Sequence, residues 1–469
     1  MSDEKFRVEK DVLGEMKVPA NVYWGVNTQR AIENFKISGK RIPPLFILAL
    51  AQLKKACLLA NLELGLIEKD LGNALLQAAD EIVKEGKYLD QFPIDVFQTG
   101  SGTQTNMNMN EVLANRANQI LGKPMGKKQP VHPNDHVNKG QSSNDVIPSA
   151  MHITAIQLLK ANLIPTIKQL IKVLDDKIKE FDGVVKVGRT HLQDAVPIPL
   201  STEFKVYKKQ IDQNQQRLLN SCNELKYLPI GGTALGTGIG SSNKFPDLVC
   251  IFLSQISGNN FSPNPILAEG IASHNTIVNT SATLRSLALS LLKLANDIRL
   301  MGSGPRAGLG ELILPANEPG SSIMPGKVNP TQSEALIQVC LQVIGNDAAI
   351  ASGEAFGSML DLNVCKPLMI VNLVESINIL EGGITSFIEH CLKGLEPNTS
   401  KINADLESML MVVTNLAPII GYDKCSELAK LAHDEGKTIK EVIKEKGIVI
   451  DGDLDELLDP KRMVKPMDE

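Results

Sequence analysis

The chain has 469 residues, of which 43% are hydrophobic and 22% are charged, and its formal net charge is −5. This length allows two or three domains with a large core, and the composition is ordinary for a soluble globular protein. The negative balance argues against a general nucleic-acid or anionic-membrane surface, although a local cationic site could still bind a small anion.

The cysteines and the N-terminal segment both indicate a reducing compartment. Seven Cys are scattered without metal-ligand spacing, which argues against a disulfide framework and against a cysteine-bound iron–sulfur cluster. The segment from Met1 to Lys5 begins no apolar run and no Arg-rich amphipathic pattern, so we expect no secretory or transit peptide. We also expect no membrane span, because no uninterrupted apolar run is long enough. The expected location is the cytoplasm, or the mitochondrial matrix if a transit peptide has been removed.

Helical periodicity begins near Pro44 and extends to Lys87, with leucines recurring at spacings of three to five. The next segment, Gly100 to Glu111, places Ser101 and Thr103 before a helix that we predict to run through Leu121. Hydroxyl groups at a helix start most often serve only as caps, so this signal has low specificity by itself.

A pair of histidines four residues apart, His132 and His136, invites a metal interpretation. Pro133, Asn134 and Asp135 between them favour a turn over a helix, so the two imidazoles need not share a face. No HExxH pattern follows, and we therefore predict no metal site.

A third polar helix start, Gln141 to Asp145, opens the central part of the chain. Dense apolar periodicity from Ile147 to Ile178 predicts a helix that Pro165 kinks. Two further helices are predicted over 201–228 and 277–300. Between Ile271 and Leu292 the only charged residue is Arg285, so we expect the second of these helices to be buried on all sides, at the centre of an oligomer.

Two segments between these helices are predicted to be irregular. Prolines at 197 and 199 limit Val187–Pro197 to a loop or a short strand, and its lone His191 would ordinarily be structural. The glycine-rich segment 231–240 fails the GxGxxG pattern because Ser241 replaces the last glycine, and it fails the P-loop pattern because Thr237 replaces the lysine. We interpret it as a turn that approaches a helix closely.

The segment from Gly320 to Pro330 is a flexible, hydroxyl-bearing loop that leads into a helix. Asn329 is the predicted N-cap, Pro330 the first helical residue, and Gln332 the capping-box partner. With Lys327 just upstream, free N–H groups, the positive end of the helix dipole and an ammonium would converge, which predicts an anion site.

Two last helices are predicted over 402–419 and 424–444, with Gly421 as the break between them. The predicted fold is mainly α with three domains. These are a mixed, mostly helical N-terminal domain (1–140), a central helical-bundle domain (141–398), and a small C-terminal helical domain (399–469).

Four segments together resemble the signature regions of class II fumarases, within the fumarase/aspartase superfamily: 100–111, 131–145, 187–194 and 320–334. Aspartases generally carry Gln in place of His191 and Ala in place of Gly326, so both positions favour a fumarase. The resemblance implies a three-domain fold whose long central helices form the core of a homotetramer, with each active site shared between subunits.

The implied reaction is the hydration of fumarate to L-malate and its reverse, a carbon–oxygen lyase step of the tricarboxylic acid cycle. It would proceed by anti addition or elimination through an aci-carboxylate intermediate, with a small dicarboxylate as substrate and without metal or organic cofactor. Two alternatives stay open. One is an aspartate ammonia-lyase or related fumarate-producing lyase, and the other is a non-catalytic structural homologue.

The resemblance also assigns roles to residues. Ser321 would be the base and His191 the acid, oriented by Glu334, while Lys327 and Asn329 would stabilise the intermediate. The residues expected to bind substrate are Ser101, Thr103, Ser142, Ser143, Asn144, Thr190, Ser322, Lys327 and Asn329. A secondary dicarboxylate site would comprise His132, Asn134 and Asp135, although Gln129 stands where close relatives often carry Arg.

Overall fold

The structure is a computed structural model that describes residues 5–464. Residues 1–4, on which part of the leader-peptide prediction rests, lie outside this range. The chain is mostly helical and forms two compact units. Unit 1 contains Met1–Pro165, Gln216–Ser286 and Leu341–Glu381, and unit 2 contains Thr166–Gln215, Leu287–Cys340 and Gly382–Glu469. The predicted mainly α class is confirmed, while the predicted three-domain division stays a prediction.

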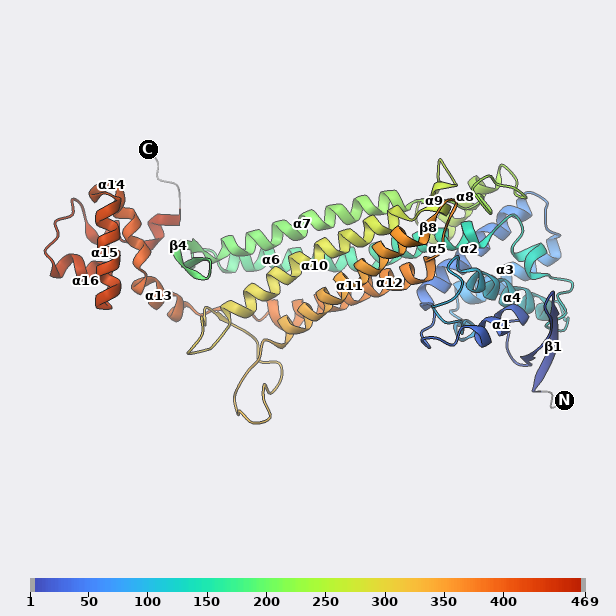
Figure 1. Cartoon of the computed structure of the whole chain (residues 1–469), viewed down its shortest axis with the longest axis horizontal. Coiled ribbons are helices and arrows are strands. Elements are labelled where there is room, and N and C mark those ends of the chain that lie inside the picture. Colours follow the sequence, from blue (N-terminus) through green and yellow to red (C-terminus); the bar gives the residue numbers. More distant parts are fainter. Residues whose placement is uncertain (1–4, 465–469) are drawn as a thin grey trace. The chain divides into compact units, whose positions relative to one another are not determined.

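Unit 1 begins with an antiparallel hairpin of β1 (Phe6–Asp11) and β2 (Gly14–Pro19), which pairs Phe6 with Pro19. Four helices follow, and in Figure 1 they carry the blue to cyan colours. They are α1 (Val26–Asn34), α2 (Pro44–Glu63), α3 (Lys69–Val83) and α4 (Thr103–Ile120). Buried leucine and alanine side chains of α2 form much of the core, in agreement with the predicted periodicity.

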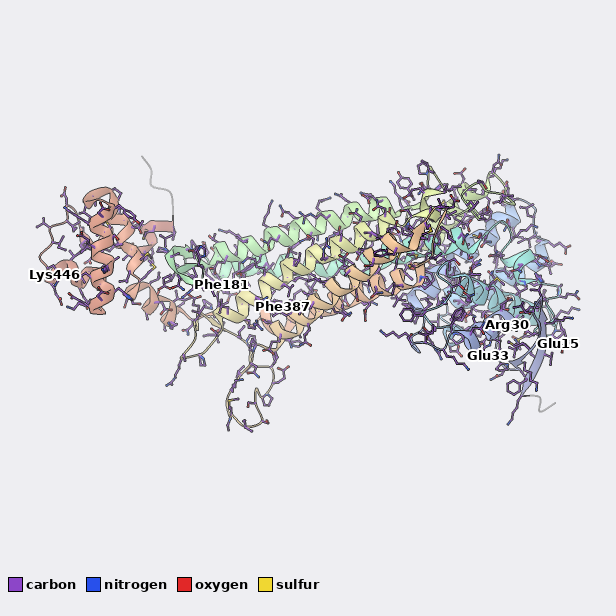
Figure 2. The ribbon with its side chains drawn as sticks, viewed as in Figure 1. Glu15, Arg30, Glu33, Phe181, Phe387 and Lys446 are labelled. Atoms are coloured by element: carbon purple, nitrogen blue, oxygen red, sulfur yellow. The ribbon has the colours of Figure 1, made fainter. Side chains whose placement is uncertain are left out.

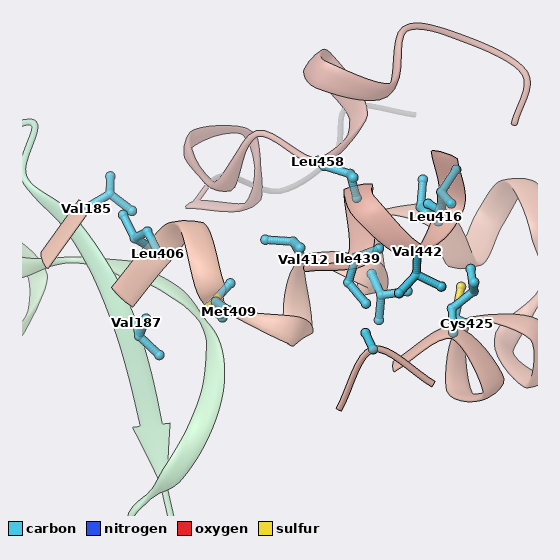
Figure 3. Packing of buried hydrophobic residues seen from close by; sticks show 14 of the residues in the cluster. Val185, Val187, Leu406, Met409, Val412, Leu416, Cys425, Ile439, Val442 and Leu458 are labelled. Atoms are coloured by element: carbon cyan, nitrogen blue, oxygen red, sulfur yellow. The ribbon is translucent and has the colours of Figure 1, made fainter. Parts of the chain in front are cut away.

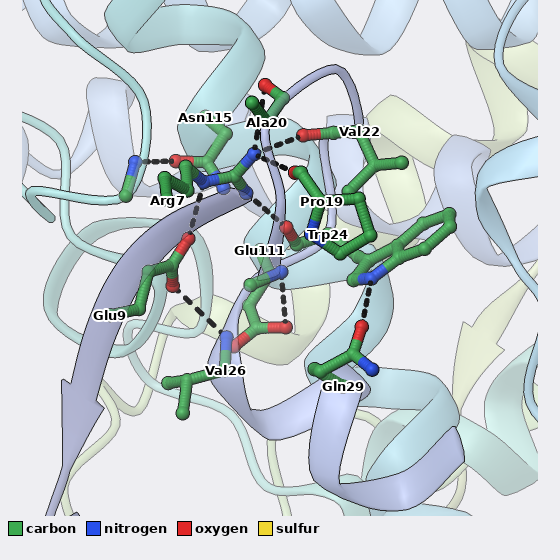
Figure 4. A network of polar contacts seen from close by, with 12 residues as sticks. Arg7, Glu9, Pro19, Ala20, Val22, Trp24, Val26, Gln29, Glu111 and Asn115 are labelled. Atoms are coloured by element: carbon green, nitrogen blue, oxygen red, sulfur yellow. Dashed lines mark hydrogen bonds and ion pairs between the residues drawn. The ribbon is translucent and has the colours of Figure 1, made fainter. Parts of the chain in front are cut away.

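Polar side chains fix the start of α1 (Figure 4). The carboxylate of Glu111, which is 1% exposed, accepts hydrogen bonds from the backbone N–H groups of Gly25 and Thr28. Arg7 donates to Glu9 and to backbone carbonyls that include that of Val22. An ion pair between Arg30 and Asp11 then joins α1 to the hairpin, with Arg30 labelled in Figure 2. The two bonds to Glu111 satisfy backbone N–H groups at the start of α1, where a helix leaves such groups without intrahelical partners.

The predicted kink at Pro165 takes the form of a π-helical turn. Helix α5 (Ser143–Leu158) leads into the turn Leu159–Leu163, and α6 (Ile164–Glu180) follows it. Pro165 has no N–H to donate to the preceding turn, so the regular ladder of hydrogen bonds cannot continue through this point.

The long helices are α7 (Leu200–Leu225), α10 (Asn275–Met301), α11 (Thr331–Gly357) and α12 (Lys366–Phe387). The first two agree with the predicted ranges 201–228 and 277–300. The remaining elements of unit 1 are short, apart from α8. They are β5 (Tyr227–Leu228), α8 (Phe245–Ser257), β6 (Ser262–Pro263), α9 (Glu269–Ala272), β8 (Ser358–Met359) and β9 (Leu362–Asn363).

Three helical stretches are long and apolar enough to cross a membrane, judged by length and composition alone: Pro44–Glu63, Thr331–Gly357 and Lys366–Leu392. Polar residues interrupt each of these helices, so they contain no uninterrupted apolar run of this length, and the expectation of no membrane span stays a prediction. The most apolar windows are 67% buried in the first helix but 33% and 44% buried in the other two. The latter two therefore leave apolar surface exposed.

Unit 2 contains the hairpin of β3 (Val185–Thr190) and β4 (Gln193–Pro199), and β7 (Leu312–Ile313) paired with β10 (Glu396–Pro397). The C-terminal helices, coloured red in Figure 1, are α13 (Thr399–Ser408), α14 (Ala417–Ile420), α15 (Tyr422–Glu435), α16 (Ile439–Glu445) and α17 (Leu454–Leu457). Their buried side chains form a cluster that also includes Val185 and Val187 of β3 (Figure 3).

The two helices predicted at the C-terminal end are each shorter than expected. The first ends at Ser408 and is followed by a 3₁₀ segment, Leu410–Leu416. The second ends at Glu435, and the following Gly436, with a φ of 62°, closes α15 in the left-handed conformation that glycine adopts without strain.

Candidate functional site

Three hydroxyl groups meet where α4 and α5 begin. Ser101 Oγ lies 2.8 Å from Thr103 Oγ1, which in turn lies 2.8 Å from Ser143 Oγ. The first two residues precede or open α4, and Ser143 opens α5. Gly102 between them has a φ of +75°, and a Cβ there would lie 3.0 Å from the Ile147 side chain. The structure therefore brings two predicted helix starts together as one row of neutral donors beside two positive dipole ends.

The start of α5 is held by a capping box between Ser142 and Asp145. Ser142 Oγ accepts from the backbone N–H of Asn144, whose side-chain amide donates to the carbonyl of Ala234. Asp145 also accepts from the backbone N–H groups of Gly231 and Thr233. Burial raises the pKa of the Asp145 carboxyl to about 7. Sequence reasoning found the serines and Asn144 but gave Asp145 no role.

The glycine-rich segment makes the close approach that we predicted. A Cβ at Gly231 would lie 2.4 Å from Pro246 in the first turn of α8, and Gly231 has a φ of +90°. A side chain fits neither the backbone conformation nor the space. The segment thus supports the start of α5 through Asp145.

Asn134 and Asp135 of the predicted second site lie on a single π-helical turn, Pro133–Val137, and His132 is the N-cap of this turn. The expectation of a turn without helical character was therefore wrong over these five residues. His132 Nδ1 accepts from the backbone N–H groups of Asn134 and Asp135 at 3.2 Å each, and His136 Nδ1 accepts from the N–H of His132. No group of three or more His, Cys, Asp or Glu that could hold a metal occurs within residues 5–464.

In unit 2, Thr190 and His191 stand at the tip of the β3–β4 hairpin. Thr190 pairs with Gln193, so His191 and Leu192 are the two central residues of the turn, and their φ values are 55° and 60°. Positive φ at both positions is the pattern of a type I′ turn, which usually contains Asn and Gly. A histidine and a leucine in this conformation carry backbone strain, and such strain concentrates at functional sites.

A buried ionic network holds the base of the same hairpin. Glu311, which is 1% exposed, accepts from Arg189 Nη1 at 2.5 Å, and its other oxygen lies 3.3 Å from Lys186 Nζ. Lys186 also pairs with Glu203 at 3.1 Å. A cavity of about 230 Å³ has Arg189, Glu311 and Leu192 in its lining. Sequence reasoning missed Glu311 and Lys186, because neither stands at a predicted helix start or within a motif that carries chemistry.

The loop before α11 is closed at its base by Asn329, whose amide Nδ2 donates to the carbonyl of Gly320 at 2.5 Å. Ser321 Oγ accepts from the backbone N–H groups of Ile323 and Met324 at 3.3 and 3.1 Å. Oriented N–H groups therefore do point at the hydroxyl that we expect to act as base. The side chain of Lys327 is exposed.

The predicted capping of α11 was wrong in detail. The helix begins at Thr331, and the carbonyl of Pro330 accepts from the N–H of Glu334, which makes Pro330 the N-cap. The Asn329 amide closes the loop, and Gln332 Oε1 accepts from Ser386 in place of a capping-box bond. The side chains of Asn329 and Gln332, which we expected to cap α11, instead form hydrogen bonds outside this helix.

The structure brings Ser101, Thr103 and Ser143 into direct contact and places Ser142 and Asn144 beside them. In unit 2 the hairpin tip carries Thr190 and His191, and the loop carries Ser321, Ser322 and Lys327. Glu334 is exposed in the first turn of α11. Within the described residues, no hydrogen bond or ion pair joins His191 to Glu334, so their pairing stays a prediction.

Comparison with known proteins places the chain in a family. A family model described as lyase matches residues 14–345, and one described as the fumarase C C-terminus matches residues 412–465. The fumarate hydratase class II of Campylobacter jejuni is 47% identical over 462 residues, which cover 98% of this chain and 99% of the relative. The chain belongs to the class II fumarase family.

Other members of the class II fumarase family agree over the full length. The mitochondrial fumarate hydratase of Saccharomyces cerevisiae is 48% identical, covering 99% of this chain and 95% of the relative. A crystal structure of the class II fumarase from Schistosoma mansoni superposes with a TM-score of 0.95 at 38% identity and covers 99% of this chain and 100% of that one. The lyase match contains every predicted site residue, from Ser101 to Glu334.

Proposed function

We propose that the chain is a fumarate hydratase, which interconverts fumarate plus water and L-malate. The observation that carries the proposal is the row of hydroxyls from Ser101 to Ser143 at two helix starts, in a chain whose class II fumarase relatives match it from end to end. Neutral donors at helix N-termini are suited to the carboxylate of a small dicarboxylate.

The proposed reaction from malate begins when Ser321, as an alkoxide, takes a proton from the carbon next to a carboxylate. That carboxylate then carries two negative charges, and Lys327 and Asn329 stabilise it. Each well-placed donor of this kind contributes roughly 3–4 kcal/mol. His191 protonates the departing hydroxyl, which leaves as water from the opposite face, and the reverse sequence hydrates fumarate.

A serine is a weak acid, so the base role requires stabilisation of its oxyanion. The N–H groups of Ile323 and Met324 at Ser321 Oγ support that requirement. Thr190 and Ser322 are proposed to complete the substrate contacts. The scheme calls on no metal and no organic cofactor.

A homotetramer with shared active sites is proposed on the basis of exposed apolar surface. Leu289 of α10 is 53% exposed and Leu341 of α11 is 56% exposed. The burial of residues 277–300 at the centre of an oligomer stays a prediction, in which a partner subunit covers these exposed side chains. Light scattering after size exclusion measures the assembly, and activity lost on dilution in step with dissociation would support sharing.

The alternative is an aspartate ammonia-lyase or a related lyase. His191 and Gly326 favour the fumarase, since aspartases generally carry Gln and Ala there. Purified protein mixed with L-malate, without added metal, should produce the ultraviolet absorbance of fumarate. Aspartate formed from ammonia and fumarate, with no malate turnover, would replace our proposal with the alternative. Absence of both reactions would favour a non-catalytic homologue.

The remaining assignments are also proposals. The turn with His132, Asn134 and Asp135 would bind a second dicarboxylate, and binding of a dicarboxylate beyond one per active site would support it. Class II fumarase relatives occur in bacteria, and a yeast relative is described as mitochondrial. A cytoplasmic location, or a mitochondrial one, is compatible with these relatives and would be decided by fractionation.

A further inference from the structure

A lysine is buried in the middle of α2, among residues that are mostly apolar. Lys54 has no exposed surface, and its Nζ donates to Asn138 Oδ1 at 3.0 Å and to Gln141 Oε1 at 2.9 Å. Within the part of the chain that the structure describes, no carboxylate lies at ion-pair distance from this ammonium. Two neutral amides therefore hold the buried amino group of Lys54.

The side-chain oxygen of Asn138 also accepts hydrogen bonds from α4. Asn106 and Asn110, both on α4, donate to Asn138 Oδ1 at 3.1 and 3.2 Å. The side-chain oxygens of these two residues are buried without hydrogen-bond partners. Asn61, one helical turn after Cys57 on α2, donates to the carbonyl of Lys139. Helices α2 and α4 are thereby joined to the segment Asn138–Gln141.

The segment Asn138–Gln141 separates two proposed dicarboxylate contacts. Directly after it comes the capped start of α5, with Ser142, Ser143 and Asn144. Directly before it lies the π-helical turn that carries His132, Asn134 and Asp135. Ser143, whose Oγ lies 2.8 Å from Thr103 Oγ1, follows this segment by two residues.

Burial of Lys54 is unfavourable for the fold. It lowers the pKa of the ammonium to about 7, against the opposing influence of Cys57 on α2 and Asp145 on α5. A charged group in the interior without an ionic partner costs stability, and an apolar side chain of similar volume is often neutral or stabilising there. Lys54 lowers the stability of the fold but holds the segment Asn138–Gln141 next to the candidate site. A role in the site therefore explains its burial better than a role in the hydrophobic core does.

We propose that Lys54 is a positioning residue for dicarboxylate binding: it ties α2 to the segment Asn138–Gln141 and so sets the place of the hydroxyls at the start of α5. This inference rests on the proposed function. It adds a group that touches no substrate and acts through Asn138 and Gln141.

The test compares Lys54→Met with Lys55→Met in the full-length protein. Lys55 is the next residue of α2 and pairs with Asp80 near the surface, so it is a matched control. In Lys54→Met the KM for L-malate should rise about tenfold or more, with kcat changed less and with an unchanged or higher melting temperature. Lys55→Met should keep KM within about twofold of wild type. Lys54→Gln, which can still donate to an amide, should recover part of the loss.

Three outcomes would overturn the inference. The first is a wild-type KM in Lys54→Met, and the second is a lowered melting temperature with equal losses in kcat and kcat/KM. The third is misfolding of Lys54→Met together with a wild-type KM in Lys54→Gln. Calorimetric binding of succinate, a dicarboxylate that cannot react, separates this inference from the proposed function. If wild type binds succinate without turning over malate, the proposed function fails, and the succinate affinities of the variants decide the role of Lys54. If wild type neither binds succinate nor turns over malate, both fail.

Discussion

Neutralising Glu311 should weaken the contacts that hold the β3–β4 hairpin, which carries Thr190 and His191. In Glu311→Gln an uncharged amide replaces the carboxylate, whose two oxygens lie 2.5 Å from Arg189 Nη1 and 3.3 Å from Lys186 Nζ. Removing one partner of a buried ion pair costs about 3–5 kcal/mol, because the other charge stays buried. Lys186 would still have Glu203 at 3.1 Å, so we expect the lower end, about 3 kcal/mol.

Urea unfolding followed by circular dichroism measures the stability change, and malate dehydration measures the effect on the site. Because a displacement of about 1 Å at the site can cost about a hundredfold, we expect kcat/KM to fall by about that factor. The control is Glu389→Gln, which removes an exposed pair with Lys393 and should change stability by less than about 1 kcal/mol. A Glu311→Gln variant within about 1 kcal/mol of wild type and with unchanged kcat/KM would refute the reasoning.

Three further predictions concern the proposed chemistry and the core. Ser321→Ala should abolish malate turnover while leaving the melting temperature and the oligomer unchanged, since the hydroxyl lies in a loop; wild-type activity would remove Ser321 as the base. His191→Asn should slow turnover by about 10²–10⁴-fold, and an unchanged rate would mean that another group is the acid. His152, which contacts the carbonyls of Leu225 and Tyr227, has a pKa lowered to about 4 by burial. As the pH is lowered from about 6.5 to 4, His152 becomes protonated in the unfolded chain but stays neutral in the native state. The free energy of unfolding therefore decreases by about 3 kcal/mol over this range. In His152→Asn the melting temperature should depend less on pH over this range, and an unaltered pH dependence would contradict the assignment.

Local sequence determined the helical class, most helix ranges and the polar helix starts. Apolar periodicity located α7 and α10 closely, and Pro165 correctly marked an interruption, because these signals depend on residues within a few turns. The motifs around Ser101, Ser143 and Ser321 were identified for the same reason. Family resemblance then supplied the roles that composition and periodicity alone do not provide.

Tertiary structure decided which groups meet. Glu311 contacts Arg189, which lies 122 positions earlier in the chain, and nothing near either residue predicts that contact. The local sequence does not distinguish Lys54 from other polar residues on helices. Its side chain is buried because α2 packs against α4 and α5. Instead of capping α11, the Asn329 side chain donates to Gly320 in the preceding loop, and the Gln332 side chain accepts from Ser386, which lies 54 positions further along the chain. A sequence pattern specifies what a residue can do within its own helix or turn, whereas burial and distant partners are set only when the whole chain packs.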